Sequence, residues 1–224
     1  MPRKARRLLW TQAACYHVIN RGHNRETVFA DDDDRRFFLQ LLGRYRDRFF
    51  HYCLMSNHFH LLLRLVDPRL LSPLMAGLLG SYVHYFNRRY RFVGHLWQGR
   101  FKSPAIEMET YLLSCGRYIE RNPLGPGLVD EPWDYPWSSC AAYAKGDADP
   151  LLTENPYYLE LAKTPARRRK LWQRFLLDED PKERVIASDE WLLGTNTFRN
   201  EAHHSRPIGR RRGRPRKSQG TFSS

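Results

Sequence analysis

The stretch that decides the fold runs from Cys53 to Leu65 and reads CLMSNHFHLLLRL. From His58 onward it is typical of a β-strand, in which successive side chains point to opposite faces, and Ser56-Asn57 before it is typical of a turn. The alternation gives each face four side chains: His58, His60, Leu62 and Arg64 on one, and Phe59, Leu61, Leu63 and Leu65 on the other. Because the apolar face can be buried, two imidazoles are left side by side on the opposite face.

This His-x-His pair is a candidate metal site. Imidazole is a common metal ligand, and a strand holds two residues at i and i+2 close enough to bind one divalent cation. The alternative is a half-buried strand whose histidines only face solvent, because so short a pattern also arises without function. A partner elsewhere in the chain has to decide between the two interpretations.

Candidate partners for the two histidines occur on a helix that is predicted from Glu109 to Asn122 and that Pro123 helps to end. Tyr118 and Asn122 are four residues apart, so they share one face of this helix. The amide oxygen of Asn122 can complete a metal shell, and Tyr118 presents a phenol beside it. The alternative is a tyrosine that belongs to the core or covers the surface.

The remaining elements follow from local patterns. The β-rich segment from Tyr16 to Asn20 predicts a first strand, and Gly94–Ile106 predicts a loop that leads into another. Four aspartates at 31–34 precede an apolar-periodic run and predict a helix start, whereas an Asp-rich metal loop lacks the spacing and glycine of a calcium site. Further helices are predicted over Arg69–Tyr90 and Arg167–Leu177.

Composition favours nucleic acid as the partner. The 224-residue chain has 37 Lys and Arg against 24 Asp and Glu, a net charge of +13, and 13% aromatic residues. Such a charge attracts phosphate polyanions, and aromatic rings stack on unpaired bases. No apolar run approaches the roughly 20 residues that a membrane span needs. The four scattered cysteines form no Cys-x-x-Cys pair, which argues against a zinc ribbon or a disulfide framework and indicates a reduced cytosol.

The charge pattern predicts four parts: a basic arm over 1–10, the main domain over 11–148, a helical extension over 149–205 and a basic tail over 206–224. The tail is rich in Arg, Gly, Pro and Ser, so we expect it to be disordered and to bind phosphates. Its RGRP sequence at 212–215 matches the core of an AT-hook, with a generic basic tail as the alternative. The candidate DNA-binding residues are Arg88, Arg89, Arg100, Lys102, Arg210, Arg211, Arg212, Arg214, Arg216 and Lys217.

Six segments occur in an order that resembles the REP-associated tyrosine transposases, which belong to the single-tyrosine HUH (His, hydrophobe, His) transposases. The resemblance covers about residues 5 to 145 and rests on Tyr16–Gly22, Asp31–Leu42, Cys53–His60, Leu96–Ser103, Arg117–Pro123 and Tyr135–Ser139. It implies an α+β fold with a ferredoxin-like antiparallel sheet and helices on one face. A mainly helical C-terminal extension would follow.

The resemblance also implies a chemistry. His58 and His60 would hold Mg²⁺ or Mn²⁺, Asn122 would sit at the third-ligand position, and Tyr118 would be the nucleophile. The substrate would be single-stranded DNA at short palindromes that fold into hairpins, cut and rejoined through a 5′-phosphotyrosine link. The segment from Arg46 to Cys53 is a few residues shorter than in relatives, so a protein that only binds hairpin DNA is the alternative. Both a monomer and a homodimer remain open.

Overall fold

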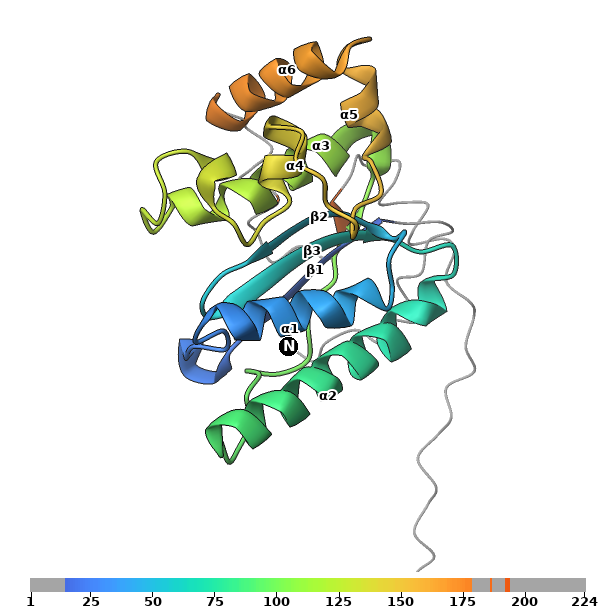
Figure 1. Cartoon of the computed structure of the whole chain (residues 1–224). Helices are drawn as coiled ribbons and strands as arrows, with labels where there is room; N and C mark the ends of the chain where they lie inside the picture. Colours follow the sequence, from blue (N-terminus) through green and yellow to red (C-terminus); the bar gives the residue numbers. More distant parts are fainter. Residues whose placement is uncertain (1–14, 179–185, 187–191, 194–224) are drawn as a thin grey trace, which may run out of the picture.

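A βαββαβ unit forms the first half of the chain in the computed structural model, which describes residues 15–178, 186 and 192–193 (Figure 1). Its elements are β1 (Cys15–Arg21), α1 (Asp32–Gly43), β2 (Phe49–Leu54), β3 (His58–Arg64), α2 (Leu71–Tyr90) and β4 (Ala105–Ile106), with short turns η2 (His23–Arg25) and η3 (Pro68–Leu70). Beyond it follow α3 (Met108–Arg121), η4 (Asn122–Leu124), η5 (Pro132–Asp134), α4 (Cys140–Ala144), α5 (Pro156–Glu160), α6 (Pro165–Leu177) and β5 (Leu192–Leu193).

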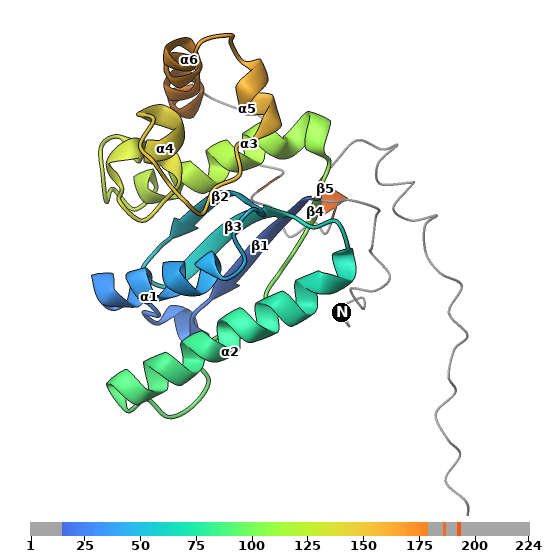
Figure 2. The ribbon, with the colours of Figure 1, turned by 45° about the vertical axis from the view of Figure 1, so that its right-hand side comes forward.

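The strands form one sheet in the order β2-β3-β1-β4-β5 (Figure 2). The first three pairings are antiparallel, and the two-residue β5 runs parallel to β4 at the edge. This order within a βαββαβ unit is the ferredoxin-like arrangement. The predicted α+β class and antiparallel sheet are therefore confirmed.

The sheet is covered on both faces, as Figures 1 and 2 show. Helices α1 and α2 pack on the face that carries Phe59, Leu61 and Leu63, as expected for the βαββαβ unit. Helix α3 covers the opposite face, where it buries Leu62 and Cys53. The prediction of helices on one face thus holds only for α1 and α2, because the second face also carries apolar side chains that have to be buried.

The aspartate-rich segment starts a helix, as predicted. The Asp31 carboxylate accepts hydrogen bonds from the backbone N–H groups of Asp33 (3.0 Å) and Asp34 (3.1 Å), and it therefore caps α1. Asp34 is fully buried and binds Arg89 and Tyr90 from the end of α2. These aspartates join two helices, and that role accounts for their number.

The hairpin of β2 and β3 is intact despite its short connection to α1. The pairing runs from Phe49 opposite Leu63 to Leu54 opposite Phe59, with one irregularity between Phe49 and His51. The short segment before Cys53 therefore leaves six residues of β2 in the sheet.

The C-terminal extension packs on α3. Trp172 and Leu176 of α6 are fully buried against Tyr143 and Tyr158. Arg117 and Arg121 of α3 donate hydrogen bonds to carbonyl oxygens at the end of α6, namely those of Phe175, Leu176 and Asp178. Guanidinium groups satisfy carbonyls that a helix end leaves free, so the contact fixes α6 to α3.

Two predicted parts, the basic arm over 1–10 and the basic tail over 206–224, lie outside the described residues. Within the described ranges, no helix has the length and apolarity that crossing a bilayer requires.

Candidate active site

Three elements bring the predicted side chains together. His58 and His60 project from β3 on the face covered by α3, and Tyr118 and Asn122 lie at the end of α3. The pairing of β1 with β3 adds His17 from the neighbouring strand. We call these five residues the Tyr118 cluster.

The rings of the Tyr118 cluster are in direct contact. The ring centroids of His58 and His60 lie 5.0 Å apart. The Tyr118 ring meets two imidazoles edge-on, at 5.6 Å from His60 and 5.8 Å from His17. A phenol therefore lies beside the imidazole pair, as the sequence predicts.

Local sequence explains why α3 approaches the sheet so closely. A Cβ atom at Gly116 would lie 2.5 Å from His51 Nε2, so only glycine fits between α3 and β2. At the end of the helix, Asn122 Nδ2 donates a hydrogen bond to the Tyr118 carbonyl oxygen (2.8 Å). With its amide nitrogen engaged in this way, Asn122 has its carboxamide oxygen left for the imidazoles.

Burial keeps the imidazoles neutral. It lowers the pKa of His17 to about 3 and holds the pKa of His60 well below its usual range, where the charges of His17 and His58 add to the effect. Burial also lowers the pKa of His58, hydrogen bonding with Asn122 opposes this shift, and the positive charge of Arg21 reinforces it. Neutral imidazole is the form that binds metals.

The donor set fits a divalent cation. His58 Nδ1 donates to Asn57 Oδ1 (2.6 Å), so the lone pair of His58 lies on Nε2. His60 Nδ1 and His17 Nε2 share a hydrogen bond of 2.9 Å, and a cation on His60 Nε2 requires the proton on Nδ1. Asn122 is in hydrogen-bonding contact with both imidazoles, so the two Nε2 atoms and the Asn122 oxygen would supply a neutral N,N,O set, with other positions left for water or phosphate oxygen. In the described parts of the chain, no group of three His, Cys, Asp or Glu residues, the three histidines of the Tyr118 cluster included, is arranged to hold a metal ion by itself.

The predicted DNA-binding residues separate into groups. Lys102 pairs with Ile19, which is itself opposite His60, so Lys102 lies on the same sheet face as the Tyr118 cluster. Arg100 is exposed in the preceding loop. The six basic residues from Arg210 to Lys217 lie outside the described residues.

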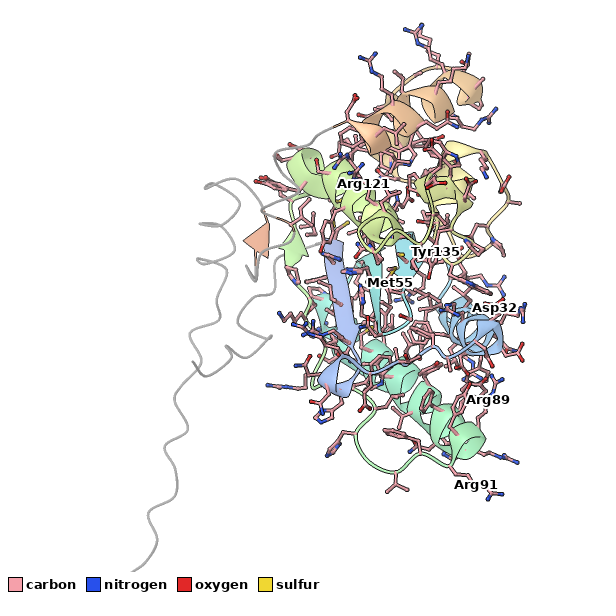
Figure 3. The ribbon with its side chains drawn as sticks, turned by 90° about the vertical axis from the view of Figure 1, so that its left-hand side faces the viewer. Asp32, Met55, Arg89, Arg91, Arg121 and Tyr135 are labelled. Atoms are coloured by element: carbon pink, nitrogen blue, oxygen red, sulfur yellow. The ribbon has the colours of Figure 1, made fainter. Side chains whose placement is uncertain are left out.

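Arg88 and Arg89 lie away from the Tyr118 cluster. Figure 3 shows Arg89 and Arg91 at the end of α2, on the other side of the sheet from Arg121 of α3. The Arg89 guanidinium forms ion pairs with Asp31 (2.6 Å) and Asp34 (2.9 Å), which balance its charge. Arg88 is exposed at the same helix end.

Sequence reasoning missed two residues, His17 within the Tyr118 cluster and Arg21 beside it. The predicted first strand contains His17 and ends at Asn20, one residue before Arg21, whereas β1 includes both and their spacing of four places them on one strand face. This periodicity was the available signal. Only the pairing of β1 with β3 shows that this strand face belongs to the site, because it sets Arg21 opposite His58.

Comparisons with known proteins show the fold and the family. A solved structure described as the REP-associated tyrosine transposase bound to a REP hairpin superposes with a TM-score of 0.51 and 18% identity, over 68% of this chain and 90% of that chain. At this identity the likeness shows a shared fold. No curated protein matches the sequence. The family described as "Transposase IS200 like" matches residues 11–122, which is half of the chain. The chain therefore belongs to the IS200-like transposase family.

Proposed function

We propose that this transposase cleaves and rejoins single-stranded DNA at short palindromic repeats that fold into hairpins, with Tyr118 as the nucleophile. One observation carries the proposal: the Tyr118 ring contacts His60 and His17 beside a neutral N,N,O donor set. A nucleophile next to a cation site is the arrangement that phosphoryl transfer through a covalent intermediate needs.

The reaction exchanges one phosphoester for another. The Tyr118 oxygen attacks the scissile phosphorus and loses its proton, and the bond from phosphorus to the 3′-oxygen breaks. The departing 3′-oxygen takes up a proton, and the phosphate stays on Tyr118 as a 5′-phosphotyrosine. Because one ester replaces another, attack by a different 3′-hydroxyl reverses the step and rejoins strands without ATP.

Three residues would hold the cation: His58 and His60 through Nε2, and Asn122 through its carboxamide oxygen. A bound Mg²⁺ or Mn²⁺ polarises a non-bridging oxygen of the scissile phosphate and favours loss of the phenol proton, whose usual pKa is near 10. The chain's own contribution is to fix these side chains. Asn57 and His17 orient the two imidazoles, and the hydrogen bond from Asn122 to the end of α3 orients the carboxamide.

Two observations support a hairpin substrate: the positive net charge of the chain and its structural similarity to a transposase solved with a hairpin. The net charge of +13 favours a phosphate polyanion, and the structurally similar transposase was solved with a REP hairpin. Exposed Arg100 and the site-facing Lys102 are candidates for backbone contacts. The basic tail stays a sequence-based prediction for duplex binding.

The test is covalent trapping. Wild type, Tyr118→Phe and Tyr111→Phe are incubated with a labelled single-stranded hairpin from DNA that flanks the gene, with Mn²⁺ or with EDTA. The products are separated on a denaturing gel. We expect a cation-dependent, protein-linked band in the wild type that Tyr118→Phe loses, because phenylalanine has no oxygen to attack phosphorus.

Tyr111→Phe is the matched control. Tyr111 lies about two turns before Tyr118 on the same helix and, like Tyr118, packs partly buried against the apolar side chains around Leu62. If attack comes from Tyr118, the same chemical change at Tyr111 has to leave the band in place. An adduct in Tyr118→Phe assigns the nucleophile to another residue. A complex on a native gel without any covalent band in the wild type supports the hairpin-binding alternative.

A further inference from the structure

Arg21 is a charged residue on the same sheet face as the Tyr118 cluster. It ends β1 directly opposite His58, so antiparallel pairing sets both side chains on the face that α3 covers. The guanidinium group is therefore close to the place where we put the scissile phosphate.

The Arg21 side chain is held without being neutralised. Its Nε and Nη2 atoms donate hydrogen bonds to Gln98 Oε1 at 3.1 and 3.0 Å. Gln98 also donates its backbone N–H to the Arg21 carbonyl oxygen at 2.9 Å. Gln98 is uncharged, and among the described residues no carboxylate forms an ion pair with Arg21. Arg89 differs, since three aspartates surround it.

The loop that supplies Gln98 is anchored in the core. Trp97 packs edge-on against Phe59 at 5.6 Å, and its backbone pairs with Gly22. The backbone N–H of His23 donates to the Leu96 carbonyl oxygen at 2.9 Å. These contacts fix Gln98 relative to β1, so the orientation of Arg21 is set before any ligand arrives.

We propose that Arg21 is a further catalytic residue, whose guanidinium group, positioned by Gln98, binds a non-bridging oxygen of the scissile phosphate. The inference rests on the proposed function. A fixed guanidinium can donate through Nη1 while Nε and Nη2 stay on Gln98, and it stabilises the negative charge that develops on phosphate oxygens as Tyr118 attacks.

The experiment measures single-turnover formation of the covalent adduct for wild type, Arg21→Gln, Arg21→Lys and Arg25→Gln. Each variant receives the native hairpin and two hairpins that carry a methylphosphonate of defined stereochemistry at the scissile position. We expect Arg21→Gln to slow the native reaction about 10²–10³-fold, the usual loss on removing one such donor. Hairpin affinity in EDTA should stay within about threefold, since one phosphate contact among many is lost.

The methylphosphonates locate the contact. In one isomer the methyl group replaces the oxygen that Arg21 binds, so Arg21→Gln should slow that substrate less than about threefold. With the other isomer the full loss should remain. A charge effect of general origin would instead appear in Arg25→Gln, a neighbouring exposed arginine. Arg21→Lys, which keeps the charge without the guanidinium geometry, should fall between wild type and Arg21→Gln.

The outcomes separate the two proposals. If the wild type forms no adduct, the proposed function fails and this inference fails with it. If the wild type reacts and Arg21→Gln reacts equally fast, only the role of Arg21 is overturned. An equal loss with all three substrates also overturns it, because the effect then does not come from a phosphate oxygen.

Discussion

Helix α3 carries two polar clusters that differ in how their polar atoms are satisfied. The Tyr118 cluster has a buried imidazole nitrogen, His17 Nδ1, that has no hydrogen-bond partner among the residues that the structure describes. The second cluster, which we call the Glu120 cluster, consists of Glu120, His51, Ser139, Asn155 and Trp172. Glu120 is only two residues from Tyr118 in sequence, and both clusters pack between α3 and the sheet.

Within the Glu120 cluster the polar atoms are matched. Glu120 Oε1 accepts hydrogen bonds from His51 Nδ1 and Ser139 Oγ, both at 2.7 Å, and Oε2 accepts from Trp172 Nε1 at 2.9 Å. His51 Nε2 in turn accepts from Asn155 Nδ2 at 3.1 Å. Glu120 and His51 are fully buried. A buried, satisfied network stabilises the fold, whereas donors and lone pairs left without partners are available to a ligand.

The largest expected difference between the two clusters is the loss of folding stability when one of their side chains on α3 is removed. Glu120→Ala leaves the buried donors of His51 and Trp172 without an acceptor and leaves Ser139 Oγ only its longer bond to the Tyr52 carbonyl oxygen (3.4 Å). We expect the free energy of unfolding to fall by about 3–5 kcal/mol. Asn122→Ala, two residues further along, should cost less than about 1 kcal/mol, because the hydrogen bonds that it removes are only partly buried and lie at the helix end. Urea unfolding measures both variants. Equal losses would show that the two clusters do not differ in this way.

The next effect in size comes from adding the cation. If Mn²⁺ binds the Tyr118 cluster, a concentration of 100 times Kd stabilises the wild type by about 2.7 kcal/mol. This corresponds to a rise in Tm of about 5–10 °C for a chain of this size. We expect the rise to be absent in His60→Ala and in the presence of EDTA, and thermal unfolding followed by circular dichroism measures it.

The control for this experiment is His84→Ala. His84 is an exposed histidine on α2, on the far side of the sheet from the Tyr118 cluster, so its removal should leave the Mn²⁺ effect intact. If His60→Ala keeps the full rise, the cation binds elsewhere and the N,N,O set is not its site.

Sequence periodicity predicted the parts of this architecture that depend on neighbours in the chain. Alternation from His58 to Leu65 gave the two faces of β3, and the aspartates before Phe37 gave the start of α1. The four-residue spacing of Tyr118 and Asn122 placed both on one face of α3. Each of these inferences needs only the geometry of a single helix or strand.

Contacts between distant segments could not be predicted in this way. The register that sets Arg21 opposite His58 depends on how β1 pairs with β3, and local pattern does not determine it. Arg89 has the composition of a DNA contact, yet aspartates about 55 residues earlier bind it. The partners of Glu120 come from β2, the loop before α4 and α6. The presence of a glutamate on a predicted helix does not indicate which distant residues will bind it.

The smallest expected effect is the change in Mn²⁺ affinity when Asn122 is substituted. It tests whether the Tyr118 cluster supplies three ligands to the cation. Asn122→Ala should weaken Mn²⁺ binding about tenfold, or about 1.4 kcal/mol, because two imidazoles remain and water can replace a neutral oxygen ligand. Asn122→Asp keeps an oxygen at the same place and adds a charge, so it should bind Mn²⁺ at least as tightly as the wild type. Calorimetric titration measures all three proteins. Identical affinities would remove Asn122 from the cation site and leave its amide nitrogen the role of binding carbonyl oxygens at the end of α3.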